Sequence, residues 1–198
     1  DYHIIVLDAN ELESHDLKHP DKSYSSFISE EQIIWLMEDL DNTNLPTILF
    51  MHQGLDNDMA GVENSTKVRY ALEKANEKAG FKKVKIVFSG HRHLDYHNVI
   101  NGIHYIQINS ASYHYIGRNY PSVPYTPEIN RRFPVTEFTL PYKEPIWGIG
   151  EFYSSGEFVL RGKKSEFVGK TPKELGISHF EQPYPIVPEI SNRKLAIS

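Results

Sequence analysis

The chain has 198 residues, of which 39% are hydrophobic and 12% aromatic, so it can build one folded domain with a real core and an extension. The formal charge of −5 and the lack of a basic run argue against nucleic acid or an anionic membrane as a partner. No apolar stretch approaches the ~20 residues that cross a bilayer. The absence of cysteine excludes disulfides, cysteine zinc sites and thiol catalysis.

The chain begins with a predicted strand. Residues 2–7 are a continuous apolar run that ends in a polar turn, which is typical of a central strand. Asp8 in that turn either caps the turn or accepts a hydrogen bond from a metal-binding histidine. Residues 11–28 are predicted to form a surface loop in which His15 and His19 are solvated.

Two helices are predicted next, at residues 29–41 and 63–79. Ser29 is a good N-cap, and Gln32 three residues later completes the pattern of a capping box. The second helix is expected to end at Gly80. The first helix carries an apolar face that we expect to be core, made of Ile33, Leu36, Met37 and Leu40 and widened by Ile34 and Trp35.

Two buried-type strands end in histidine. Residues 47–51 lead into His52, and residues 86–88 lead through a Ser-Gly turn into His91 and His93. Because one helix separates these strands, we expect them to be parallel neighbours whose histidines converge at one edge of the sheet. Imidazole is neutral near pH 7 and is a good ligand for zinc, iron, manganese and nickel, so the pattern predicts a metal site.

The loop after His52 contains three acidic residues, which could also be metal ligands. Residues 53–64 are polar and contain glycine, so we favour a solvated loop for Asp56, Asp58 and Glu63.

The remaining chain is predicted to be rich in β-structure. Asn101-Gly102 between two apolar runs is a strong hairpin signal. Tyr113 and His114 after it either face a substrate, where they could bind a phosphate oxygen, or are wall residues. Between residues 121 and 145 six prolines exclude long helices, a second hairpin is expected at 146–161, and the tail from residue 176 is expected to be an extended strap.

The histidine pattern resembles a known family. A strand followed by His52 and, after one helix, a strand followed by Gly90-His91-Arg92-His93 is similar to the last two motifs of the calcineurin-like metallophosphoesterases. An Asn-Ser-Ala-Ser segment at residues 109–112 extends the resemblance, which covers roughly residues 1–115. The family's earlier motifs, Asp-x-His, Gly-Asp-x-x-Asp and Gly-Asn-His, are absent, since the match at Asp1-Tyr2-His3 precedes a strand instead of following one.

The resemblance implies an α/β (α+β) fold, part of a four-layer αββα sandwich, at residues 1–120, with a β-rich, proline-rich extension at 121–198. It implies a metal-dependent phosphoester hydrolase, a phosphatase or phosphodiesterase, that uses two Zn, Mn or Fe ions roughly 3.5–4 Å apart. By this resemblance His52 and His91 would bind one metal and His93 the other, and no catalytic residue besides these ligands lies in the chain.

Because only three ligands match, we expect the chain to be the second half of a longer phosphoesterase, to bind metal weakly or not at all alone, and to be inactive alone. The expected partners are a small phosphoester substrate and the first half of the same protein. Without that half, an open sheet edge and a bare apolar face are expected to drive homodimerisation. The sequence does not distinguish between the bacterial cytoplasm and the periplasm as the location of the protein.

A rival interpretation is a non-catalytic α/β module that binds a sugar, a peptide or a partner chain, with incidental histidines. The 12 tyrosines and 10 phenylalanines favour it, because aromatic side chains make good recognition surfaces.

Overall fold

The computed structural model describes residues 1–11, 26–57, 60–177 and 184–197. The chain divides into two compact units. The first unit comprises residues 1–92 and 97–107, and the second comprises 93–96 and 108–198. The predicted domain boundary at residue 120 therefore falls inside the second unit. His15, His19 and Asp58 lie outside the described residues.

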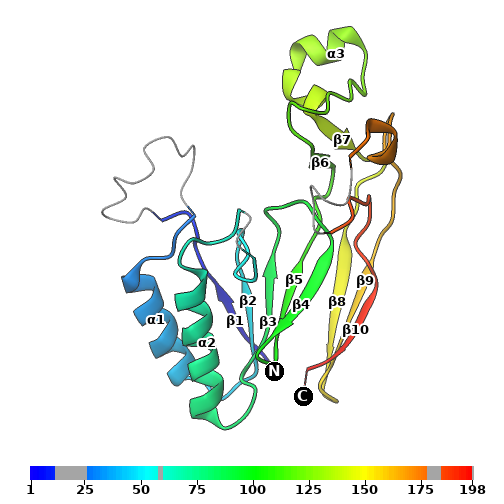
Figure 1. Ribbon diagram of the computed structural model, residues 1–198. Coiled ribbons are helices and arrows are strands. Elements are labelled where there is room, and N and C mark those ends of the chain that lie inside the picture. Colours follow the sequence, from blue (N-terminus) through cyan, green and yellow to red (C-terminus); the bar gives the residue numbers. More distant parts are fainter. Residues whose placement is uncertain (12–25, 58–59, 178–183, 198) are drawn as a thin grey trace. The chain divides into compact units, whose positions relative to one another are not determined.

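A five-stranded sheet organises the first unit (Figure 1), with the strand order β1-β2-β3-β5-β4. Its strands are β1 (His3–Val6), β2 (Thr47–Phe50), β3 (Val84–Ser89), β4 (Tyr96–Ile100) and β5 (Ile103–Gln107). The first four strands in this order pair in parallel, as the sequence predicted for the two histidine strands. The hairpin is also confirmed, because Asn101 and Gly102 both have positive φ, 50° and 81°, as a type I′ turn requires.

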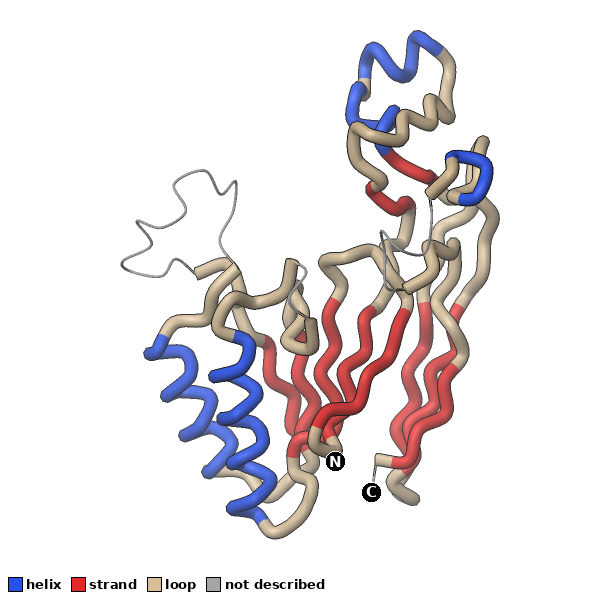
Figure 2. The backbone as a smooth tube through the Cα atoms, viewed as in Figure 1, coloured by secondary structure: helices blue, strands red, loops and turns tan. Residues whose placement is uncertain are grey.

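Two helices, α1 (Glu30–Asp41) and α2 (Ser65–Ala79), cover one face of this sheet, as Figure 2 shows. Ser29 caps α1 by accepting a hydrogen bond from the Gln32 amide. The capping box is wrong in its second half: the Gln32 side chain turns away to bond the backbone of Asp8, which fixes the end of β1 against the helix. The C-cap of α2 is confirmed, since Gly80 has φ +71° and its amide bonds the carbonyl of Glu77.

The core of the first unit lies between these helices and the sheet. In β1, β2 and β5 alternate residues point to it because side chains of a strand alternate between faces, and in β3 the register irregularity between Val84 and Ile86 brings Val87 to the same face. These residues are Ile5, Leu7, Leu49, Met51, Val84, Val87, Ile103 and Tyr105, and the helices contribute Ile33, Leu36, Leu40, Val68, Ala71, Leu72 and Ala75. The predicted apolar face of α1 was too wide, because Ile34, Trp35 and Met37 are exposed.

The opposite face of the sheet is apolar and partly bare at one edge. β1 is the edge strand, and Ile4 and Val6 on its far face are 53% and 71% exposed. Phe50 of the neighbouring strand lies opposite Val6 and is 40% exposed. A sheet edge and an apolar strip of this kind are surfaces that usually bind another protein segment.

The second unit is mainly antiparallel. It holds a two-stranded ladder of β6 (Tyr113–Tyr115) and β7 (Thr139–Pro141), joined through α3 (Pro127–Arg132) and the 3-10 helix η1 (Pro134–Phe138). A second sheet has the order β10-β9-β8, from β8 (Gly148–Tyr153), β9 (Glu157–Gly162) and β10 (Arg193–Ala196), and the 3-10 helix η2 (Lys173–Leu175) lies between β9 and β10 in the chain.

The predicted hairpin at 146–161 is confirmed as β8 and β9. The tail is more regular than predicted, because its last residues pair with β9 as β10 instead of forming only a strap.

The predicted α/β class is therefore confirmed, with a helical layer on a largely parallel sheet in the first unit and antiparallel strands in the second. Among the described residues, no helix is long and apolar enough to cross a bilayer.

Candidate functional site

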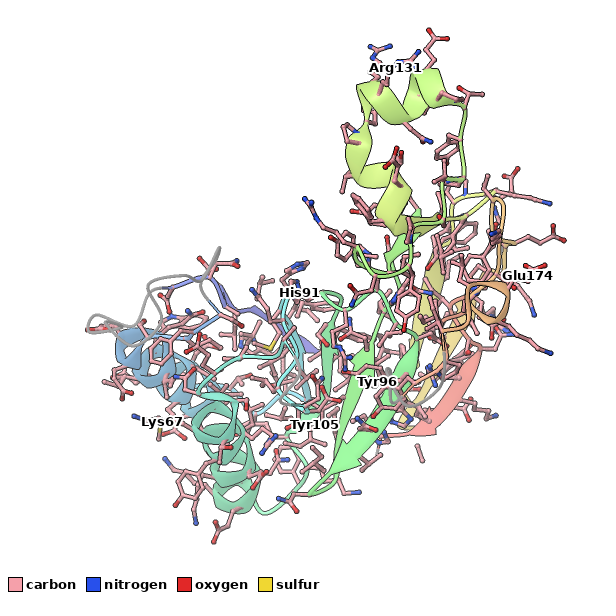
Figure 3. All side chains as sticks on the ribbon, turned by 45° about the horizontal axis from the view of Figure 1, so that its top comes forward. Lys67, His91, Tyr96, Tyr105, Arg131 and Glu174 are labelled. Atoms are coloured by element: carbon pink, nitrogen blue, oxygen red, sulfur yellow. The ribbon has the colours of Figure 1, made fainter. Side chains whose placement is uncertain are left out.

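The ends of β2 and β3 are tied together beyond the strands themselves. The Met51 amide donates to the carbonyl of Phe88, and the amides of Gly90 and His91 both donate to the carbonyl of His52, at 3.0 Å each. These bonds carry the parallel pairing past the last strand residues and fold the turn after β3 over the end of β2. The two histidines are thereby neighbours at the carboxyl edge of the sheet, where α/β sheets commonly place their ligands, and Figure 3 shows His91 beyond the strand ends.

The two imidazole rings meet through their nitrogens. Nδ1 of His91 lies 3.0 Å from Nε2 of His52, the ring centroids are 4.9 Å apart, and the ring planes cross at 73°. Two zinc–nitrogen bonds of about 2.0–2.1 Å at a tetrahedral angle would place the ligating nitrogens about 3.3 Å apart. The observed 3.0 Å would therefore need to open by only roughly 0.3 Å to hold a metal.

A second histidine pair, which the sequence did not predict, provides a contrast. His97 and His104 lie on β4 and β5, and Nε2 of His97 is 2.9 Å from Nδ1 of His104. Their ring planes differ by only 15° and the centroids are 5.1 Å apart, so the rings lie nearly end to end. This arrangement suits one N–H···N hydrogen bond, whereas the crossed rings of His52 and His91 can converge on a common ion.

A third metal ligand is not found beside the pair. Within the described parts of the chain, no group of three or more His, Cys, Asp or Glu residues could hold a metal ion. The structure thus brings His52 and His91 together, and the three-ligand prediction stays a prediction.

The third predicted ligand, His93, belongs to the second unit and has an unusual backbone. Its φ is +52°, a left-handed conformation that few non-glycine residues adopt. Its ring lies edge-on to that of Tyr113, with centroids 5.0 Å apart. Nδ1–H of His114 donates to the carbonyl of His93 at 2.8 Å.

Both residues predicted to face a substrate therefore contact His93. Tyr113 is 37% exposed, so its ring can reach solvent, whereas His114 is only 3% exposed. Their role toward a substrate stays a prediction.

Acidic residues near the site are held in the loops. The Asp8 carboxylate accepts hydrogen bonds from the backbone and side chain of Asn10, which is the turn-capping role considered above; its role behind a metal ligand stays a prediction. Asp56 is half-buried and accepts a bond of 2.7 Å from the Asn98 side chain, so the predicted solvated loop is in fact anchored on β4. Gly54 allows this, because a Cβ there would lie 2.9 Å from the Asp56 carboxylate.

The fold and the histidine edge define a class, a mixed α/β protein with a paired-imidazole site at the ends of parallel strands. Comparison with known proteins adds little at the level of sequence: neither a family model nor a curated protein matches the chain. Among solved structures, the chain is similar to a dimetal phosphatase from Danio rerio, with 14% identity and a TM-score of 0.44. That match covers 75% of this chain, which spans 40% of the phosphatase.

The chain is also similar to a single mutant of Vps29 from Entamoeba histolytica, with 11% identity and a TM-score of 0.22 over 85% of this chain and 99% of that one. Likenesses at these TM-scores do not establish a family.

Proposed function

We propose that this chain forms part of a metal-dependent phosphoester hydrolase, in which His52 and His91 bind one metal ion. The observation that supports this proposal most directly is the convergence of Nε2 of His52 and Nδ1 of His91, 3.0 Å apart with crossed rings, at the carboxyl edge of two parallel strands. The proposal assigns His93 to a second metal, as the resemblance of the Gly-His-x-His turn to metallophosphoesterases implies.

The residues present fit a metal in part. Both rings offer a nitrogen toward the same point, and His52 is exposed while His91 is half-buried, so an ion and a substrate can reach them. Two imidazoles are fewer than the three or four protein ligands of ordinary zinc sites. We therefore propose that another segment of the same protein, carrying carboxylate and histidine ligands, completes the site.

In this proposal the chain holds the metal ion and orients the imidazole rings of His52 and His91 toward it. The double hydrogen bond at the His52 carbonyl fixes the backbones that carry the two rings before any ion is bound, which lowers the entropic cost of binding it. A bound Zn, Mn or Fe ion would polarise a phosphoryl oxygen as a Lewis acid. Imidazole with carboxylate suits all three metals, so the metal we assign is one of these. The substrate class we assign, a small phosphoester, rests on the resemblance of the Gly-His-x-His turn to metallophosphoesterases.

The test uses the longest reading frame that contains this chain. Metal content and hydrolysis of p-nitrophenyl phosphate and of its bis-ester are measured for the wild type, His52→Ala, His91→Ala and, as the matched control, His97→Ala. We expect His52→Ala and His91→Ala to lose metal and at least about 99% of the hydrolysis rate, because each change removes a side chain that binds the metal directly. The control, His97→Ala, should keep its metal and its rate.

Wild-type rate and metal content in His52→Ala would show that the wrong histidines were assigned. Metal-independent background hydrolysis by the whole protein, together with tight binding of a sugar or peptide, would favour the rival binding module. The chain of 198 residues alone is expected to hydrolyse neither substrate above background.

A further inference from the structure

The segment that follows His93 carries a buried carboxylate. Asp95 is 8% exposed, and its side chain is only 3% exposed. A carboxylate removed from water is unfavourable unless hydrogen bonds and an opposite charge compensate it. All of the partners described below come from the C-terminal segment, nearly a hundred residues away in the sequence.

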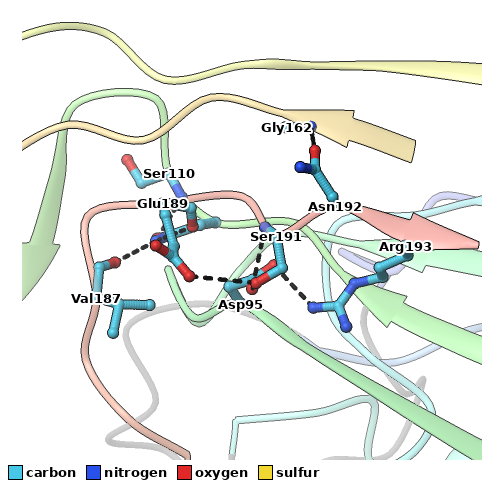
Figure 4. A network of polar contacts seen from close by, with 9 residues as sticks. Asp95, Ser110, Gly162, Val187, Glu189, Ser191, Asn192 and Arg193 are labelled. Carbon is cyan, nitrogen blue, oxygen red and sulfur yellow. Dashed lines mark hydrogen bonds and ion pairs between the residues drawn. The ribbon is translucent and has the colours of Figure 1, made fainter.

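Two residues of that segment compensate Asp95 (Figure 4). The Arg193 guanidinium donates to Oδ1 at 2.9 Å, and both the amide and the hydroxyl of Ser191 donate to Oδ2, at 3.2 and 2.5 Å. The Arg193 side chain is itself only 16% exposed, so solvent screens this ion pair weakly.

The C-terminal segment is held on its path by independent bonds. The Asn109 side chain donates to the carbonyls of Val187 and Glu189, at 2.7 and 3.1 Å. Ile190 is 4% exposed, and its amide donates to the carbonyl of Lys163. The segment 187–193 is therefore a fixed part of the second unit and can serve as an anchor.

The turn at His93 needs such an anchor, because a left-handed backbone at a non-glycine residue is intrinsically unfavourable. His114 holds the turn from β6 through the His93 carbonyl, and Tyr113 packs against the His93 ring. Asp95, two residues on, ties the same turn to Ser191 and Arg193.

We propose that Ser191 and Arg193 are positioning residues, which act through Asp95 to fix the backbone and ring of His93. The part of this proposal that concerns metal binding rests on the proposed function. The positioning itself is a property of the metal-free chain, so the two can fail separately.

The experiment follows the histidine ring signals of the metal-free chain by NMR at one fixed pH. The variants are Arg193→Ala, Arg193→Lys, Ser191→Ala and the matched control Lys194→Ala, whose side chain is on the same strand and pairs with Glu157. We expect Arg193→Ala to shift the His93 ring signals, as the ring leaves the face of Tyr113, and to raise amide exchange at residues 93–96 at least about tenfold. The signals of His97 and His104 should stay in place.

Lys194→Ala should change none of these quantities, and Arg193→Lys should restore part of the His93 shift because it keeps the charge. If Arg193→Ala does not fold, Ser191→Ala carries the test, since it removes one bond to Asp95 and leaves the ion pair. A folded Arg193→Ala or Ser191→Ala with unchanged His93 signals and exchange overturns the proposal. Failure of Zn²⁺ to shift His52 and His91 in the longest reading frame that contains this chain would instead count against the proposed function alone.

Discussion

Gly162 and Gly148 lie opposite each other in the ladder between β8 and β9, but a side chain would meet a different kind of obstacle at each. A Cβ at Gly162 would lie 1.7 Å from the carbonyl oxygen of Ile190 and 2.4 Å from its carbonyl carbon. A Cβ at Gly148 would have as its nearest neighbour Cδ1 of Leu160, at 3.0 Å. The first obstacle is backbone and the second is the end of a flexible side chain.

We therefore expect Gly162→Ala to displace the segment around Ile190. Local overpacking typically costs about 1–3 kcal/mol. Displacement would also expose Ile190, which is 4% exposed and whose burial is worth about 1.5–3 kcal/mol, and would strain the bonds of Ser191 to Asp95. The expected loss of unfolding free energy is about 3 kcal/mol or more for Gly162→Ala and below about 1 kcal/mol for Gly148→Ala.

Equilibrium unfolding in urea, with the m-value held constant between variants, measures both losses. An unfolding free energy of Gly162→Ala within about 1 kcal/mol of the wild-type value, or equal losses for the two variants, would refute the close contact between Gly162 of β9 and the backbone of Ile190.

Burial raises the pKa of the Tyr105 and Tyr142 phenols, so the folded chain keeps both protons to higher pH than the unfolded chain, whose tyrosines titrate near about 10. These two phenols should therefore leave the unfolding free energy unchanged below about pH 10 and should lower it above that pH, by up to about 1.4 kcal/mol per pH unit for each phenol. Tyr105→Phe should remove about half of that slope, as measured by urea unfolding at a series of pH values. An unchanged slope would contradict the burial of the Tyr105 phenol as the cause. The apolar strip of Ile4, Val6 and Phe50 on the edge strand should drive self-association of the isolated chain. Light scattering should show dimers for the wild type and fewer for Val6→Lys, and a monodisperse 22.9 kDa wild-type monomer would contradict this. Asn101→Ala should lower the unfolding free energy by about 1–2 kcal/mol, because φ +50° is less favourable for alanine than for asparagine. Thermal unfolding of the variant measures this loss, and an unchanged midpoint would count against the type I′ turn.

The parts of the fold that were predicted are those that local sequence determines. The strands at 47–50 and 84–89 are short runs of apolar residues, α1 has an N-cap and a periodic face, and Asn101-Gly102 specifies its own turn. β10 was missed because Arg193–Ala196 has no strand pattern, and its partner, β9, is about thirty residues earlier in the chain. The partner of Gln32 was missed for a similar reason, since the choice between Ser29 and Asp8 depends on how β1 packs against α1.

The candidate site, like the fold, has features that the sequence could predict and features that it could not. That His52 and His91 meet follows from two parallel neighbouring strands, each ending in histidine. The backbone bonds at the His52 carbonyl and the crossing angle of the two rings could not be predicted, because no sequence pattern records them. The His97–His104 pair could have been suspected from the hairpin, because these positions flank the turn and share one face. The compensation of Asp95 by Ser191 and Arg193 could not have been predicted from the sequence, because it joins residues that only the folded chain brings together.

The most direct test of the central claim is a Zn²⁺ titration of the longest reading frame that contains this chain, followed by the imidazole ¹⁵N and ¹H signals of its histidines. The account predicts that Nε2 of His52 and Nδ1 of His91 shift together as one ion binds between them, that His91→Ala abolishes the response of His52, and that His97 and His104 keep their signals. Equal responses at both histidine pairs, or a His52 response that survives His91→Ala, would contradict a shared metal site at the ends of β2 and β3.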